Sequence, residues 1–312
     1  MPKTCAADRW FLTGPTAAGK TDVGIELARR LDAEIVSLDS MALYRGMDIG
    51  TAKPTGEQRA EVPHYLVDVI GPHEDYSLAR YLDEAARCVD EIRSRGREAL
   101  FVGGTPLYLK GLLRGIFEGP PADHRLRRAL RDEAERSGTE ALHRRLAQLD
   151  PAAAERLHPN DLKRTVRALE VYEKTGRPIS ELQRQFHTGR PADECRVFVL
   201  DRPRAELHAR INRRVDAMFA AGLVDEVRRL LDRPQPLART PRQAVGYREV
   251  IEHLQGERAL ADTVEFVKRH TRQMAKRQMT WFRSLSECRF LGVEGCAEPA
   301  AMAERILRAA AG

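Results

Sequence analysis

Long apolar runs are missing from this sequence: no stretch approaches the roughly 20 consecutive apolar residues that a membrane span requires. The 312 residues are 42% hydrophobic and 31% charged, a composition typical of a globular soluble protein. The stretch Met1–Arg9 also lacks the apolar segment of a secretory signal. We therefore expect a protein that works in the cytoplasm and not at a membrane.

Cysteine and histidine patterns that hold metals are missing as well. The five cysteines are scattered and include no C-x-x-C pair, which argues against both a disulfide framework and a zinc site. The histidines show no metal-ligand spacing, and His158 stands just before Asn160 and Asp161, either of which would cap a helix. We expect ordinary reduced thiols.

Positive charge is what the chain has in excess. The formal net charge is +6, which favours polyanionic partners but is also common in proteins that never bind nucleic acid. Lysine and arginine become denser after about residue 120. The charge is therefore informative mainly through its location.

A glycine-rich loop is the strongest local motif. Its pattern is G-x-x-x-x-G-K-[ST], formed by Gly14, Pro15, Thr16, Ala17, Ala18, Gly19, Lys20 and Thr21. A short apolar strand over 9–13 precedes it and a helix over 22–31 follows, as a nucleotide-binding P-loop requires. Backbone amides of such a loop stabilise phosphate oxygens, while Lys20 would reach the terminal phosphates and Thr21 would bind Mg²⁺. The motif does not identify the phosphate compound.

Further strands predict an α/β fold. Apolar segments over 34–38, 99–102 and 197–200 alternate with helical patterns such as 78–95, which indicates a parallel sheet of the P-loop NTPase type with helices on both faces. Such sheets place ligand groups at the carboxyl ends of their strands, where Asp39 and Thr105 would join the P-loop. Taken alone, Asp39 could be a magnesium ligand, a general base or a helix cap.

An all-helical insertion interrupts this core. Residues 122–194 show leucines at helical spacing and many basic residues, so we predict a core of residues 1–121 and 195–312 with the insertion between them. A helix over 262–284 carries a packing face and a basic remainder. The proline-rich piece 233–241 is predicted to be a loop.

The segment Asp39–Pro54 closely resembles a block of the tRNA dimethylallyltransferases, also called tRNA isopentenyltransferases, in which D-S-x-x-x-Y-x-x-M-D-I-G-T-A-K-P follows the P-loop. Further blocks agree in order, at residues 102–108, 158–161, 164–171, 245–248 and 276–283. The resemblance runs from Gly14 to Arg283, whereas a kinase would share the first block alone. Two departures are Ala18, where many members have serine, and the absence of the zinc finger of some eukaryotic relatives, which indicates the bacterial type.

The resemblance implies transfer of a dimethylallyl group from dimethylallyl diphosphate to the exocyclic N6 amine of the adenine 3′-adjacent to the anticodon, at position thirty-seven of the tRNA. Asp39 matches the family's general base, and Thr105 matches the hydroxyl that positions the adenine. Lys20 and Mg²⁺ would stabilise the leaving diphosphate. Arg210 and Arg214 match an R-I-x-x-R pattern that clamps it, or else they are two solvated arginines on one helical face.

A set of tRNA contacts follows from the same resemblance. It comprises Asp39, Ser40, Met41, Ala42, Thr105, Arg127, Lys163, Arg164, Thr165, Val166, Arg167, Gln243, Ala244, Val245, Gly246, Tyr247 and Arg248. The target adenine must leave the stack of its loop, so the basic insertion would grip the phosphates of the anticodon stem-loop. We expect a monomer.

Three other functions share part of this pattern. A small-molecule kinase would bind ATP on the P-loop, and a prenyltransferase of free adenine nucleotides would not need the basic insertion. A non-catalytic RNA-binding protein could use the loop as a nucleotide sensor. The pair Asp39 and Thr105, together with the insertion, argues against all three.

Overall fold

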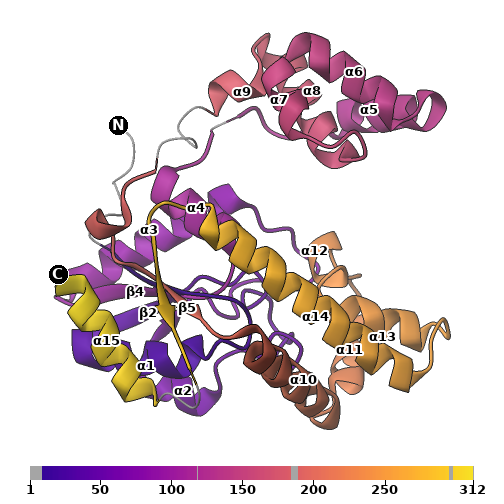
Figure 1. Ribbon diagram of the computed structural model, residues 1–312. Coiled ribbons are helices and arrows are strands. Elements are labelled where there is room, and N and C mark those ends of the chain that lie inside the picture. The colour runs from indigo at the N-terminus through magenta and orange to yellow at the C-terminus, as the bar shows by residue number, and fades with distance from the viewer. Residues whose placement is uncertain (1–8, 118, 184–188, 295–297, 312) are drawn as a thin grey trace. The chain divides into compact units, whose positions relative to one another are not determined.

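Two compact units make up the chain in the computed structural model, which describes residues 9–117, 119–183, 189–294 and 298–311. The sheet unit consists of residues 1–113 and 189–312, and the helical unit of residues 114–188 (Figure 1). The helical unit contains residues 122–188 of the predicted insertion, of which 184–188 lie outside the described residues. A stretch that is continuous in sequence thus separates two parts of one sheet.

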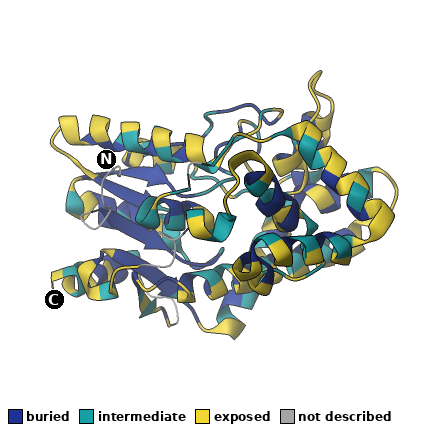
Figure 2. Ribbon diagram, turned by 90° about the horizontal axis from the view of Figure 1, so that it is seen from above, coloured by how far each residue is buried: buried dark blue, intermediate teal, exposed yellow. Residues whose placement is uncertain are grey.

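The sheet has six parallel strands in the order β3-β2-β4-β1-β5-β6. The strands are β1 (Trp10–Thr13), β2 (Ala33–Ser37), β3 (His64–Tyr65), β4 (Glu98–Val102), β5 (Val197–Asp201) and β6 (Cys288–Gly292). This confirms the predicted α/β sheet and adds two edge strands, β3 and β6. The central strands are continuous apolar runs because both of their faces are buried, as Figure 2 shows in dark blue.

Alternate residues of the central strands pack into different cores. In β1, Phe11 contributes to one cluster while Trp10 and Leu12 contribute to the other. Helices α1 (Lys20–Leu31) and α15 (Pro299–Ala311) cover the second cluster. Helix α3 (Leu78–Ser94), with Tyr81 and Val89 buried, covers the first. The predicted layers of helices on both faces are therefore present.

The remaining helices of the sheet unit are α2 (Gly56–Glu61), α4 (Pro106–Arg114), α10 (Arg204–Ala220), α11 (Leu223–Leu231), α12 (Arg239–Arg242), α13 (Tyr247–Leu254) and α14 (Leu260–Arg283), with a short 3-10 helix at Ala192–Glu194. Helix α10 packs on α14 through a small core that contains Ile211, Val215 and Val267. The same core includes Ala17 of the glycine loop, so these two helices lie next to that loop. The predicted loop 233–241 was wrong at its end, because α12 begins at Arg239.

The helical unit has its own core. Its helices are α5 (His124–Ser137), α6 (Thr139–Leu149), α7 (Pro151–Arg156), α8 (Leu162–Thr175) and α9 (Ile179–Leu182). Leu130, Leu142 and Leu169 are buried together, as the leucine spacing predicted. The side chain of Asp161 accepts the backbone N–H of Arg164, which confirms the helix cap after His158.

No described helix is both long and apolar enough to cross a bilayer. Cys88 is half-buried, and Cys195 and Cys288 are buried, whereas Cys5 and Cys296 lie outside the described residues.

Candidate functional site

The glycine loop connects β1 to the first turn of α1. Gly19 adopts φ 99° and Ala17 φ 63°, left-handed conformations that turn the loop back on itself before the helix begins. The Lys20 ammonium donates to the carbonyl of Pro15 at 2.8 Å, which holds that side chain across the loop. Helix N-termini and successive loop amides bind anions. The loop therefore has the conformation that its motif predicts.

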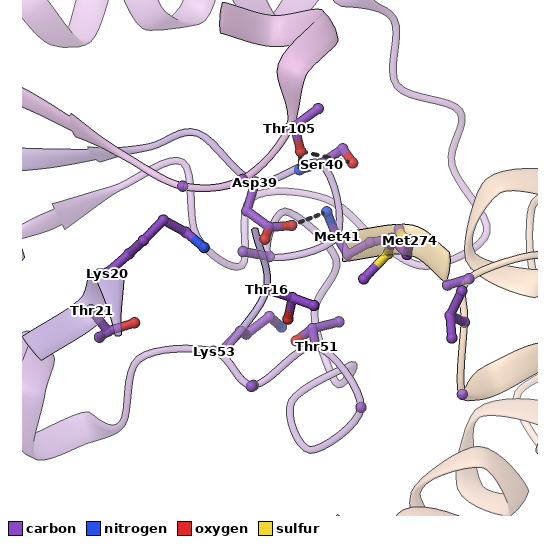
Figure 3. A pocket seen from close by; sticks show the side chains of 18 of the residues that line it. Thr16, Lys20, Thr21, Asp39, Ser40, Met41, Thr51, Lys53, Thr105 and Met274 are labelled. Atoms are coloured by element: carbon purple, nitrogen blue, oxygen red, sulfur yellow. Dashed lines mark hydrogen bonds between the residues drawn. The ribbon is translucent and has the colours of Figure 1, made fainter. Parts of the chain in front are cut away.

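A pocket of about 210 Å³ opens beside this loop. Such a volume greatly exceeds the roughly 15 Å³ that one water needs. Lys20, Asp39 and Thr105 line the pocket together, so three strand ends meet there as predicted. Figure 3 shows Asp39 in the view between Lys20 on one side and Thr105 with Ser40 on the other.

A close approach of two strand ends brings Asp39 and Thr105 together. A Cβ at Gly103 would lie 2.3 Å from the carbonyl carbon of Leu38, so only glycine allows the turn after β4 to pack against the end of β2. The backbone N–H of Thr105 donates to the carbonyl of Leu38 at 3.0 Å. The hydroxyl of Thr105 in turn accepts the backbone N–H of Ser40 at 3.0 Å.

Asp39 uses only part of its hydrogen-bonding capacity. Its Oδ1 accepts the backbone N–H of Met41 at 2.8 Å, which fixes the carboxylate in a local turn and not at the start of a helix. Its Oδ2 has no hydrogen-bond partner among the described residues. Because Asp39 lines the pocket, this second oxygen is available to accept a proton.

Positive charge gathers on the other side of the pocket. Burial and the neighbouring Arg214 guanidinium lower the pKa of Lys20 to about 8, although Asp39 opposes this effect. Burial also lowers the pKa of Arg214. Two cations that repel one another in a buried site are expected to bind an anion tightly, because the anion relieves the repulsion.

The two predicted clamp arginines have different surroundings. Arg214 lines the pocket and approaches the hydroxyl of Thr16 at 3.4 Å. Arg210 does not line the pocket in the described part of the chain, and its Nε donates to the carbonyl of Ala17 at 2.8 Å. Arg202, which had no predicted role, donates to the carbonyl of Ala18 at 3.4 Å. Two of the three arginines therefore brace the backbone of the loop.

Gln278 joins the two sides of the pocket, whereas its helical spacing predicted only a packing position. Its Oε1 accepts the backbone N–H of Thr16 at 3.0 Å, and its Nε2 donates to the carbonyl of Gly104 at 2.6 Å. Met274 of the same helix lines the pocket, as does Met218 of α10. The predicted packing face of α14 is thus partly a pocket wall, a role that its helical spacing does not distinguish from core packing.

The predicted tRNA-contacting residues of the sheet unit mostly line this pocket. These are Asp39, Ser40, Met41, Ala42, Thr105, Ala244, Val245, Gly246 and Tyr247. Gln243 and Arg248 are not part of the described lining, and Arg248 instead pairs with the buried Glu249 at 2.5 Å.

In the helical unit, the predicted contacts divide by exposure. Thr165 and Val166 have buried side chains, whereas Lys163 and Arg164 are exposed. Arg127 binds the buried Glu170 through two hydrogen bonds of 2.8 Å, and Arg167 bonds to the same carboxylate. Glu170 therefore holds two of the predicted contact arginines in fixed positions.

We expect the stability of the helical unit to depend on Glu170 at acidic pH. Burial raises the pKa of Glu170, but hydrogen bonds from Arg127, the backbone N–H of Asp123 and Arg167 together lower it to about 2, below its usual 4.5. A depressed pKa stabilises the fold above about pH 4.5, and this contribution is lost as the pH falls toward 2. It amounts to about 3 kcal/mol, since one pKa unit corresponds to about 1.4 kcal/mol.

Thermal unfolding from pH 6 to pH 2.5 tests this expectation. Glu170→Gln should be less stable than wild type at pH 6, with a smaller difference at pH 2.5. Glu173→Gln serves as the control, because that residue of the same helix makes only a partly exposed ion pair with Arg145. Equal pH profiles for all three proteins would contradict the assignment.

The donor groups of the described residues limit how a metal ion could bind. No described group of three or more histidine, cysteine, aspartate or glutamate side chains could hold a metal ion. Mg²⁺, however, keeps several waters and uses few protein oxygens beside substrate phosphates. The Thr21 hydroxyl lies on the pocket beside Lys20, which fits that mode of binding.

Comparisons with known proteins agree with this site. Residues 42–285 match the model of the IPP transferase family, and residues 8–68 match that of isopentenyl transferases. The tRNA dimethylallyltransferase of Rhodopirellula baltica is 50% identical over 289 residues, covering 90% of this chain and 86% of the relative. That of Thermotoga maritima is 49% identical and covers 88% of each chain.

Solved structures give the same result. The full-length tRNA isopentenylpyrophosphate transferase from Bacillus halodurans has a TM-score of 0.69 at 37% identity, with 96% of each chain covered. A eukaryotic dimethylallyltransferase acting on tRNA has a TM-score of 0.74 at 27% identity, covering 91% of this chain and 73% of that one. Since the family model spans most of the chain, and relatives about half identical match nearly all of it, the chain belongs to the IPP transferase family, which includes the tRNA dimethylallyltransferases.

Proposed function

We propose that this protein transfers the dimethylallyl group of dimethylallyl diphosphate to the N6 amine of the adenine 3′-adjacent to the anticodon of tRNA and releases diphosphate. The observation that carries the proposal is that one pocket contains both a phosphate-binding loop and the Asp39–Thr105 pair. A small-molecule kinase would share the phosphate-binding loop, but the match to the IPP transferase family over residues 42–285 extends far beyond that loop. Family membership supports the same assignment.

On the acceptor side, Asp39 acts as the general base. An adenine amine is a weak nucleophile because its lone pair is delocalised into the ring, so its proton must leave as the new C–N bond forms. The free Oδ2 of Asp39 accepts that proton. The Thr105 hydroxyl, which accepts the backbone N–H of Ser40, positions the adenine ring.

On the donor side, the protein stabilises the charge that develops on the leaving diphosphate. Lys20, Arg214 and the loop amides bind the diphosphate, while Arg210 maintains the shape of the loop. Mg²⁺, held by the hydroxyl of Thr21, supplies further charge neutralisation when it is bound. Met218 and Met274 provide apolar surface for the five-carbon chain.

The helical unit binds the anticodon stem-loop. Because Thr165 and Val166 are buried, the contacts of that segment come from the exposed Lys163 and Arg164, together with Arg127 and Arg167. The adenine is withdrawn from its stack before it reaches the pocket. We expect the protein to act as a monomer in the cytoplasm, where its tRNA substrates are found.

A direct assay tests the proposal. The purified protein is incubated with dimethylallyl diphosphate, Mg²⁺ and either unmodified tRNA or AMP, beside a sample that contains ATP alone, and digested nucleosides are analysed by mass spectrometry. Isopentenyladenosine in the tRNA sample only is the expected result. Product from AMP would assign a free-nucleotide prenyltransferase, and ATP consumption without prenyl transfer would assign a kinase.

A further inference from the structure

Glu226 of α11 is a buried carboxylate that is not part of the described pocket lining. Its side chain accepts four hydrogen bonds. The Oε2 atom accepts the backbone N–H groups of Asp48 at 3.0 Å and Ile49 at 2.8 Å. The Oε1 atom accepts the backbone N–H of Gly50 at 3.2 Å and the hydroxyl of Tyr247 at 2.7 Å.

These bonds compensate for the cost of burying the charge, since Glu226 is only 3% exposed. They also join segments that are far apart in the sequence: α11, the start of α13 and the loop of residues 47–53. The three bonded amides of that loop lie 176 to 178 residues from Glu226 in the sequence. Burial and the Glu226 carboxylate raise the pKa of Tyr247, so its hydroxyl remains a donor.

Both segments that Glu226 holds are walls of the pocket. Gly50 and Lys53 line it from the loop, and Tyr247 lines it from α13. The two walls lie close together, with so little space between Gly50 and the ring of Tyr247 that a Cβ added at Gly50 would be only 2.5 Å from Cε2 of that ring. Lys53 also anchors the loop from its other end through Asp48 at 2.8 Å and Asp68 at 2.6 Å. Lys53 thus holds the loop from within, and Glu226 bonds it to α13.

We infer that Glu226 is a positioning residue of the proposed transfer reaction: by binding the loop amides and Tyr247 at once, it sets the distance between two walls of the reaction pocket. Its action goes through those walls, because the described pocket lining does not include Glu226. A misplacement of about 1 Å in a reacting group can lower turnover by about a hundredfold. This inference rests on the proposed function.

The variant Glu226→Gln tests it with little change in volume. A glutamine that keeps its oxygen toward the amides of Asp48 and Ile49 turns its NH₂ group toward the backbone N–H of Gly50. Both groups are donors, so the hydrogen bond to Gly50 is lost. We expect faster hydrogen exchange of the peptide that contains residues 47–54, by tenfold or more, in the absence of substrates. At saturating tRNA and dimethylallyl diphosphate, kcat should fall by about tenfold to a hundredfold, while the Kd for tRNA changes by less than about threefold.

Glu34→Gln is the control, because Glu34 is likewise a buried carboxylate that accepts a tyrosine hydroxyl, here with an arginine as a second partner. Its buried carboxylate accepts the hydroxyl of Tyr65 and a guanidinium N–H of Arg95, both at 2.7 Å, and the described pocket lining does not include it. Both variants are assayed well below their unfolding temperatures. A general loss of stability would affect the two alike, whereas positioning predicts lower kcat for Glu226→Gln alone.

Two results would overturn the inference: unchanged exchange of residues 47–54 in Glu226→Gln, or faster exchange with wild-type kcat. If the proposed function itself is wrong, the wild-type protein will transfer no prenyl group, and this result is distinct from the two above. In that case the exchange experiment still decides whether Glu226 holds the loop.

Discussion

Asp39→Asn lowers kcat by about a thousandfold, within the range that general bases contribute, while the Kd for tRNA stays within about threefold of wild type. Asparagine is nearly isosteric and can still accept the backbone N–H of Met41. What it removes is the oxygen that takes the proton of the adenine amine. Single-turnover kinetics and filter binding measure the two quantities, and Asp39→Ala should abolish turnover in the same way.

The substitution also separates two roles of Asp39. If the carboxylate served only to stabilise its local turn, asparagine would preserve turnover close to the wild-type rate, and the assignment as general base would be wrong. The assay is best done at pH 7, because the charge of Asp39 raises the pKa of Lys20 and its loss lowers that pKa further. At this pH, Lys20 still carries its proton in wild type.

Lys20→Met lowers kcat/KM by about a hundredfold to a thousandfold, since one group that stabilises developing charge is worth that much. Lys268→Met is the control, because that lysine forms ion pairs with Asp216 and Glu265 on the surface of the same unit. The control should retain nearly full activity. Equal losses in both variants would indicate a general electrostatic effect and not a role at the diphosphate.

The pKa of Lys20 gives this prediction a pH signature. With a pKa of about 8 in the free protein, the amine is largely neutral at pH 9 and must take up a proton when the diphosphate binds. Affinity for dimethylallyl diphosphate therefore decreases as the pH rises through 8. Titration calorimetry at pH 8.5 in two buffers of different ionisation enthalpy should detect proton uptake in wild type and none in Lys20→Met.

Consecutive motifs and strand ends were predictable from the sequence. The glycine loop is contiguous, and its chemistry follows from the residue types alone. Asp39 and Thr105 follow strands whose carboxyl ends must meet in a parallel sheet, and the structure places both on one pocket. The alternation of Phe11 and Leu12 between two cores follows in the same way from the period of a strand.

Contacts between a side chain and distant backbone atoms were not predictable, unlike the local helix cap of Asp161. Glu226 binds amides 176 to 178 residues away, and amides carry no residue-specific signal. Arg210 and Arg214 share a helix face by their spacing, but only Arg214 is part of the described pocket lining. Gln278 lies on a face of α14 that the helical period assigns to packing. Which part of an apolar face borders a cavity depends on what stands opposite, and that is determined by the tertiary fold.

The division of the sheet unit has a consequence for synthesis on the ribosome. Strand β1, which leads into the glycine loop, lies between β4 and β5, and β5 begins only at Val197. The helical unit is continuous in sequence and has a core of its own. Since domains tend to fold as they emerge, the part proposed to bind RNA can be complete while the phosphate-binding strand still lacks its second neighbour. A chain that stops before β5 would present an RNA-binding surface without a working catalytic centre.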